Sequence, residues 1–177
     1  MGEGSGRPAP ARDRRHPARL RNARLAVVQA LYQADVNRVA VDGVLEEFLR
    51  FRLNTDIEDP EGPDGSKADV GLFTEILRGT AARGAEIDTI LAAVLPPDWP
   101  MDRLEVLLRA ILRAGCYELL ARAAVPARVV ITEYVELAHA FFTGGEPKMV
   151  NGVLDRLARN LRPGELDGAK GERRPPA

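Results

Sequence analysis

A chain of 177 residues with a formal net charge of −1 has the size of one domain with tails. Its single cysteine, Cys116, excludes an internal disulfide and a cysteine-cluster metal site, and its leucine neighbours predict a small core residue. No apolar run approaches the roughly 20 residues of a membrane-spanning helix, and the N-terminus lacks the apolar core of a secretory signal, so we expect a cytoplasmic protein without a membrane anchor.

Positive charge is concentrated at the N-terminus. Residues 1–24 hold seven arginines against Glu3 and Asp13, a local net charge of +5. Residues 1–18 are rich in Gly, Pro, Ala and Arg without periodicity, which predicts a disordered arm. Such an arm either attracts a polyanion or only keeps the protein in solution, and its composition favours neither. A second irregular segment, residues 54–66, is acidic but lacks the ligand order of an EF-hand, so we expect a solvated loop.

Apolar residues at helical spacing predict a first helix over residues 19–38. Arg21, Arg24 and Tyr32 follow a face beside the apolar stripe, where guanidinium groups and a phenol suit phosphate pairing and base stacking. On pattern alone, a half-buried tyrosine beside solvated arginines is the better interpretation, because short motifs of this kind often occur without the function. The stripe itself comprises Ala23, Val27, Ala30, Leu31 and Ala34.

Three further helices are predicted in the middle of the chain. Residues 42–53 start at the N-cap candidate Asp42, and residues 67–94 contain Gly79 and Gly84, at which we expect a kink or break. Residues 103–121 follow the cap candidate Asp102 and are apolar around more than half the circumference, which predicts a central helix contacted on several sides. Its inward positions are Leu104, Leu108, Ile111, Leu112, Gly115 and Leu119, and its polar positions are Arg109, Arg113 and Glu118.

Two helices complete the predicted fold. One covers residues 127–142 after Pro126, and the other begins near Lys148. Gly152 in the last helix predicts a close approach by a neighbouring helix. Residues 163–177 are polar, and we expect a disordered tail. The apolar stripe of the last helix comprises Val150, Val153, Leu154, Leu157 and Leu161.

Aromatic and basic residues lie close together in the sequence where these two helices are joined. Phe141 and Phe142 are adjacent at a helix end, so they point to different faces and one is expected to be exposed near Lys148 and Met149. The first turn of the last helix either docks against the core or presents a surface to a ligand. The pattern alone favours docking.

The pattern is helical throughout, which predicts an all-α fold, a compact bundle of six to seven helices with short connections. His16 lies in the predicted arm and His139 stands alone on a helix, so neither belongs to a metal or catalytic pattern. Glu133 and Glu136 lack the Glu-x-x-His partners of a di-iron site. We therefore expect no enzyme activity, no metal and no cofactor.

Four segments in order along the chain resemble the NusB family of bacterial transcription antitermination factors. They are residues 22–32, 108–119, 125–138 and 148–155, and the resemblance covers residues 19–162 as one RNA-binding domain. It implies a bundle of two three-helix halves and a non-enzymatic factor that binds boxA-type single-stranded RNA in leader transcripts of ribosomal RNA. The implied partners are ribosomal protein S10 (NusE) and the antitermination complex on RNA polymerase, whose processive transcription of ribosomal RNA the factor supports.

The resemblance also implies roles for individual residues. RNA contacts are expected from Arg21, Arg24, Phe141, Lys148 and Met149, and S10 contacts from Tyr32, Leu108 and Arg113. Three of the chain's residues, and the loop over residues 143–147, depart from the family pattern. Met149 stands where the family often has Phe, so a softer thioether contact replaces aromatic stacking. Thr132 stands where Asn is usual, and Leu108 replaces a polar residue, which bears on the expected S10 contacts.

Two other functions are compatible with the sequence. One is a helical adaptor that binds protein but no RNA, and salt-sensitive binding to single-stranded RNA would exclude it. The other is an RNA-recognition module related to that of ribosomal RNA cytosine methyltransferases. The sequence has no nucleotide-binding half, so we favour a free-standing factor.

Overall fold

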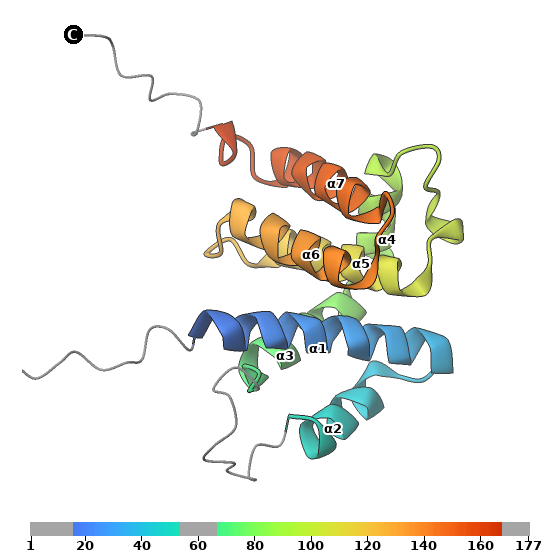
Figure 1. The fold of residues 1–177 in the computed structure, drawn as a ribbon, viewed down its shortest axis with the longest axis vertical. Helices are drawn as coiled ribbons and strands as arrows, with labels where there is room; N and C mark the ends of the chain where they lie inside the picture. Colours follow the sequence, from blue (N-terminus) through green and yellow to red (C-terminus); the bar gives the residue numbers. More distant parts are fainter. Residues whose placement is uncertain (1–15, 54–66, 168–177) are drawn as a thin grey trace, which may run out of the picture.

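The computed structural model describes residues 16–53 and 67–167. Within these ranges the chain forms seven α-helices, a short 3-10 helix and no strand, which confirms the all-α prediction (Figure 1). None of the described helices is both long and apolar enough to cross a membrane. The helices are α1 (His16–Asn37), α2 (Val41–Phe51), α3 (Val70–Ala82), α4 (Gly84–Val94), α5 (Val106–Ala121), α6 (Ala127–Phe141) and α7 (Glu146–Leu161), and the 3-10 helix η1 is Met101–Arg103.

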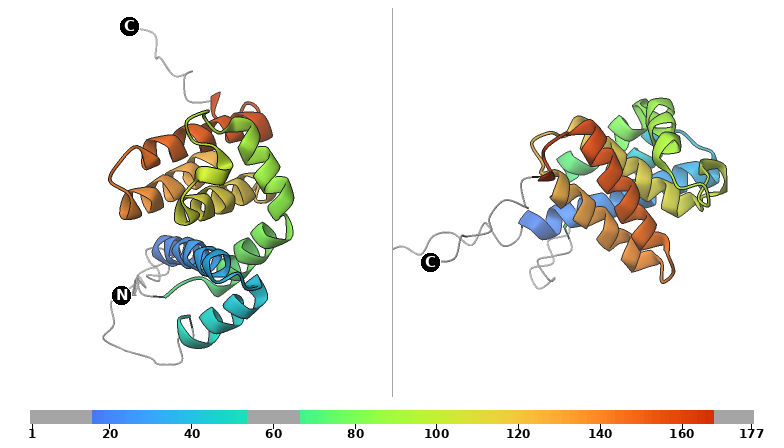
Figure 2. Two further views of the ribbon diagram at one scale, coloured as in Figure 1. Left: turned by 90° about the vertical axis from the view of Figure 1, so that its right-hand side faces the viewer. Right: turned by 90° about the horizontal axis from the view of Figure 1, so that it is seen from above.

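The helices form two groups that share one core. α1 packs against α2 and α3, whereas α5, α6 and α7 pack against one another. α4 leads from the first group to the second and contacts α5 and α7, so the two three-helix halves implied by the resemblance are present with α4 as their connection (Figure 2). α1 also packs along α5, which joins the halves.

Several predicted helix ends were wrong. α2 starts at Val41 with Ala40 as its N-cap residue, so Asp42 lies in the first turn and does not cap it. The break expected within residues 67–94 is confirmed, because Arg83 interrupts the helix directly before Gly84. The predicted start at residue 67 was wrong: α3 begins at Val70 and is capped by Asp69, whose carboxylate accepts a hydrogen bond from the Leu72 amide at 2.8 Å. Asp102 lies in η1, because Leu104 and Glu105 are extended and delay the start of α5.

The predicted boundaries at both termini were also wrong. α1 begins at His16, so residues 16–18 belong to the helix and not to the arm. Residues 163–167 fold back onto the bundle, where Glu165 accepts a hydrogen bond from the Ala127 amide at 2.7 Å. The remainder of the predicted arm and tail, and the acidic segment 54–66, lie outside the described residues.

The core contains a charged cluster as well as apolar side chains. The stripes predicted for α1, α5 and α7 are buried, apart from partly exposed Leu161, and Cys116 is fully buried. Glu118, expected at a polar position, is also 0% exposed. Its carboxylate accepts two hydrogen bonds from the Arg24 guanidinium, at 2.7 and 2.9 Å, and one from the Tyr134 hydroxyl at 2.8 Å. These bonds join α1, α5 and α6 at one buried point, so they fix the helices that carry the candidate site.

Close helix approach occurs at other glycines than the one predicted. A Cβ on Gly152 would meet nothing within 4 Å, and the residue is exposed, so the prediction of a contacting helix there was wrong. A Cβ on Gly79 would instead overlap the ring of Tyr117, and one on Gly115 would lie 3.1 Å from Leu154. Gly79 and Gly115 therefore allow α3 to pack on α5 and α5 on α7.

Candidate functional site

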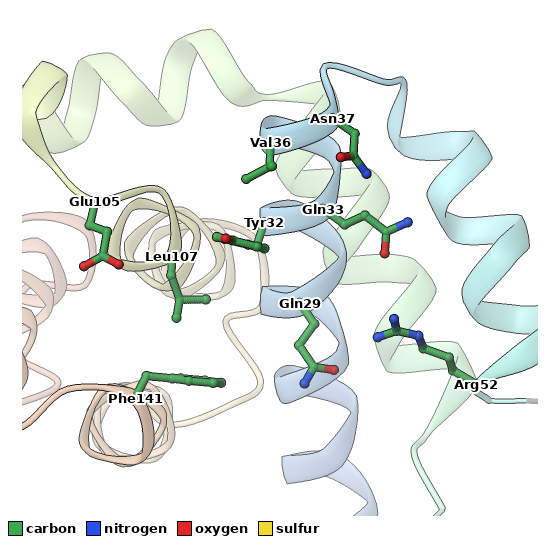
Figure 3. Close-up of a pocket in the computed structure, with 9 residues that line it drawn as sticks. All are labelled: Gln29, Tyr32, Gln33, Val36, Asn37, Arg52, Glu105, Leu107 and Phe141. Carbon is green, nitrogen blue, oxygen red and sulfur yellow. The ribbon is translucent and has the colours of Figure 1, made fainter.

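A groove of about 470 Å³ opens between α1 and the adjoining ends of α5 and α6. Tyr32, Leu107 and Phe141 point into it from the three helices, as Figure 3 shows. Tyr32 is 42% exposed and Phe141 40%, whereas the adjacent Phe142 is only partly exposed. The exposed aromatic predicted at the end of α6 is therefore Phe141, but it faces Tyr32 and Leu107 and does not share a groove with Lys148.

The opposite side of this groove is polar. Gln29, Gln33 and Asn37 follow α1, and Arg52 reaches towards them from the end of α2 (Figure 3). Gln33 donates a hydrogen bond to Glu47 at 2.9 Å. Among the described residues that line the groove, Arg52 and Glu105 are the charged ones, so their charges balance. A groove with one apolar wall, two exposed aromatic rings and little net charge resembles a protein interface more than a site for a polyanion.

Arg24 cannot contact RNA in this arrangement, which corrects the prediction for its side chain. The residue is 3% exposed, and Glu118 accepts both of its main hydrogen bonds. Burial disfavours the charged guanidinium, but the hydrogen bond and charge of Glu118 outweigh burial and raise the pKa of Arg24. The residue holds α1 against α5, the two helices that carry Tyr32 and Leu107 of the groove.

The prediction that Leu108 contacts S10 was also wrong. Its side chain is 1% exposed, because it belongs to the buried stripe of α5, and the neighbouring Leu107 lines the groove instead. The sequence contained the signal, since the same helical stripe that predicted Leu104 and Ile111 as core residues also includes Leu108. Gln29 and Arg52 were missed because their helices, α1 and α2, meet only through the tertiary fold.

Arg113 forms a clamp between helices. Its guanidinium donates two hydrogen bonds of 2.7 Å to Asp88 on α4 and one of 2.9 Å to Asp35 on α1. The bond to Asp88 is the largest cause of the raised pKa of Arg113. The side chain is 21% exposed, and its two ion pairs tie α5 to α4 and to the end of α1.

Arg21 is the most exposed of the predicted cationic residues on α1. Its side chain is 61% exposed and lies 3.5 Å from the Glu133 carboxylate on α6. The pair is long and its guanidinium end is exposed to solvent, so it is weak and leaves the guanidinium able to pair with another anion.

Lys148 and Met149 lie in a different groove, on the far side of the turn between α6 and α7. This second groove of about 500 Å³ runs between the end of α4 and one face of α7. Lys148 is exposed on its rim, whereas Met149 is 7% exposed and contributes to its floor. The expectation that Met149 is presented openly to a ligand was therefore wrong in part, because most of its side chain is packed in the core.

Among the described residues, His, Cys, Asp and Glu side chains form no group of three or more that could hold a metal ion. The two grooves offer aromatic, amide and cationic side chains, an arrangement suited to binding.

Comparison with known proteins agrees with this architecture. The model of the NusB family matches residues 21–159. A protein of Novosphingobium aromaticivorans, transcription antitermination protein NusB, is 49% identical over 140 residues, which cover 79% of this chain and 93% of the relative. Among solved structures, T. maritima NusB matches with a TM-score of 0.65 and 29% identity, covering 83% of this chain and 96% of the other.

A crystal structure of antitermination factors NusB and NusE in complex with double-stranded RNA matches with a TM-score of 0.63, covering 79% of this chain and 96% of the matched one. Its 23% identity supports the fold alone. The family match spans most of the described residues and both grooves, and the identity to the Novosphingobium protein is high over nearly the whole of that protein. The chain therefore belongs to the NusB family.

Proposed function

We propose that this protein is a transcription antitermination factor. In this proposal it binds boxA-type single-stranded RNA together with ribosomal protein S10 (NusE) and supports processive transcription of ribosomal RNA by RNA polymerase. The observation that carries the proposal is the family match over residues 21–159, which includes both grooves and all the residues expected to bind RNA or S10. We expect the protein to act in the cytoplasm without catalysing a reaction.

The two grooves suit different partners. The groove between α1, α5 and α6 is lined by Tyr32, Leu107 and Phe141 and has balanced charge, which fits a protein partner such as S10. Arg21 and Lys148 offer exposed positive charge, which fits RNA phosphates. Phe141 lines the first groove, and because its ring is 40% exposed we propose that it contacts RNA bases at the edge of the S10 site.

A protein-only adaptor is the second candidate. It is favoured by the same observation that supports an S10 site, namely the exposed rings of Tyr32 and Phe141 in an apolar groove. Such an adaptor would bind S10 or another protein through this groove and would show no salt-sensitive affinity for single-stranded RNA.

Fluorescence anisotropy with a labelled boxA-type RNA distinguishes the candidates. The titration is made with and without S10, at two salt concentrations, and with a scrambled RNA of equal length as control. The antitermination proposal expects tighter binding to boxA RNA than to scrambled RNA when S10 is present, and weaker binding at higher salt. Binding of S10 without any binding of RNA would reject this proposal in favour of the adaptor.

A further inference from the structure

Glu133 on α6 lies against two arginines of α1, the helix that packs beside it. Its Oε1 accepts a hydrogen bond from Nη2 of Arg21 at 3.5 Å, and its Oε2 lies 3.8 Å from Nη1 of Arg24. The Glu133 side chain is only 15% exposed, whereas that of Arg21 is 61% exposed. The carboxylate is therefore held by its surroundings in the bundle, and the guanidinium of Arg21 is the member of the pair that solvent leaves free to move.

Arg24 compensates the charge of Glu133 only in part. Its Nε and Nη2 both donate to Glu118, and its distance of 3.8 Å from Glu133 is too long for a hydrogen bond. Oε2 of Glu133 is buried and accepts no hydrogen bond from the part of the chain that the structure describes. The bond from Arg21 is thus the direct hydrogen bond that replaces the lost hydration of this carboxylate.

The packing of α1 does not require this second carboxylate. Arg24 and Tyr134 already meet at Glu118, which joins α1, α5 and α6 through three short hydrogen bonds. A mostly buried carboxylate with one long hydrogen bond adds little to that junction, because an incompletely paired buried charge is unfavourable. The contact of Glu133 with Arg21 therefore calls for a role other than stability.

An RNA phosphate at Arg21 would compete with Glu133. The phosphate and the carboxylate repel each other, so Arg21 pairs fully with the phosphate only by turning away from Glu133. That movement would leave a mostly buried carboxylate without its hydrogen-bond donor, which is unfavourable. The free energy lost at Glu133 offsets part of the free energy gained between Arg21 and the phosphate.

We propose that Glu133 is an intramolecular competitor for RNA phosphate at Arg21 and that it limits the contribution of this arginine to RNA affinity. This inference rests on the proposed RNA-binding function and adds a residue of opposite charge to its binding surface. Phosphate contacts carry no sequence information, so the competition weakens boxA-type and scrambled RNA equally. Glu133 thereby limits the sequence-independent part of the binding.

Glu133→Gln tests the competition, because it removes the charge and keeps the size of the side chain. In anisotropy titrations with S10 present, we expect it to tighten binding of both RNAs by about two- to fivefold at low salt, as loss of a weak ion pair would. The gain should shrink at higher salt, which screens exposed charges. Glu136→Gln is the matched control, since Glu136 is exposed one turn away on α6 and its loss changes the net charge equally. It should change the affinity much less.

A double-mutant cycle with Arg21→Met shows whether Glu133 acts through Arg21. In the Arg21→Met background, Glu133→Gln should bring no gain in affinity, because the guanidinium for which carboxylate and phosphate compete is absent. Urea denaturation checks that each variant is folded, and we expect Glu133→Gln to be so because Glu118 keeps its bonds from Arg24. Glu133→Asp is a second variant, which retains the charge on a shorter side chain and should give a smaller gain.

The outcomes separate the competition from the general function. Unchanged affinity in Glu133→Gln, an equal gain in Glu136→Gln, or a gain that persists without Arg21 would reject the competition and leave the antitermination proposal standing. Weaker binding in Glu133→Gln, or a loss confined to boxA RNA, would overturn it as well, because the carboxylate would then position Arg21 or contact an RNA base. Absence of RNA binding in the original protein and in every variant would reject both the competition and the proposed function.

Discussion

Arg24 ties α1 to α5 through the buried carboxylate of Glu118. Replacement by methionine would leave the fully buried Glu118 carboxylate without its bidentate partner, and breaking a buried ion pair costs about 3–5 kcal/mol. We therefore expect Arg24→Met to lower the free energy of unfolding by that amount, measured by urea denaturation. Any loss of RNA binding in this variant would then follow from displacement of α1.

Arg21 provides the control for this prediction, because it lies one turn away on the same helix and its side chain is 61% exposed. Arg21→Met should change the free energy of unfolding by less than about 1 kcal/mol. It should instead weaken RNA binding in the folded protein. Equal destabilisation by the two substitutions would contradict the structural role assigned to Arg24.

Cys116 makes stability depend on pH in the alkaline range. Burial raises the pKa of its thiol from 9.0 to about 12, because the thiolate would lose its hydration in the core. The folded state therefore retains the thiol proton more strongly than the unfolded state. The resulting stabilisation is complete below about pH 9 and is lost as the pH rises towards 12. Burial also raises the pKa of Tyr134 above its usual 10, and this adds a decline of the same sign.

Urea denaturation between pH 8 and pH 11 measures this effect. The original protein should lose stability with rising pH more steeply than Cys116→Ala, which cannot ionise at this position. The native thiol should also react slowly with a disulfide reagent at pH 8 and rapidly once the protein is unfolded, since the thiolate is the reactive form. Parallel pH profiles of the two proteins would show that Cys116 does not contribute.

At the scale of helices, glycines distinguish contact surfaces from open ones. Gly79→Ala adds a methyl group that would overlap the buried ring of Tyr117, and overpacking of this kind costs about 1–3 kcal/mol. The gain in helix propensity is about 1 kcal/mol, so we expect net destabilisation. Gly43→Ala, on an open face of α2, should gain the propensity without the clash and raise the stability by up to about 1 kcal/mol. Thermal unfolding of the two variants measures the direction of both stability changes. Stabilisation by Gly79→Ala would contradict the close packing of α3 on α5.

The helices could be predicted from the sequence because their apolar spacing is a local property. Val150, Leu154 and Leu157, for example, form a stripe on any helix that contains them, and all three are buried. Contacts between helices are not local, which explains why Gly152 was expected to be covered and Gly79 was not expected to meet Tyr117. Helix ends depend on individual backbone conformations, so Asp69, which caps α3, was missed in favour of Asp42 and Asp102.

The candidate site was only partly predictable for the same reason. Tyr32 and Phe141 were selected through a family resemblance, and the tertiary fold brings them into one groove. Arg24 was selected with them because it shares a helix face with Arg21. An acidic partner that lies 94 residues away in the sequence buries it, and no helical periodicity reveals such a pair.

At the scale of the whole molecule, the N-terminal segment is expected to supply affinity and the folded surface selectivity. Residues 1–15 carry four arginines, and a variant that lacks them keeps α1 complete, because that helix begins at His16. Each phosphate of a single strand that pairs with a cationic side chain contributes about −0.7 to the slope of log affinity against log salt concentration. If all four arginines pair with RNA, removal of the segment should reduce the magnitude of that slope by up to about 3.

Anisotropy titrations with S10 at four salt concentrations, for the original protein and the shortened variant, measure this slope on boxA and scrambled RNA. We expect the shortened variant to bind both RNAs more weakly at low salt, with the two slopes reduced equally. The ratio of the two affinities should not change, because phosphate contacts carry no sequence information and the grooves remain intact. If the shortened variant binds boxA RNA with unchanged affinity but discriminates less against scrambled RNA, the N-terminal segment recognises the RNA sequence. The selectivity would then be a property of that segment and not of the folded surface.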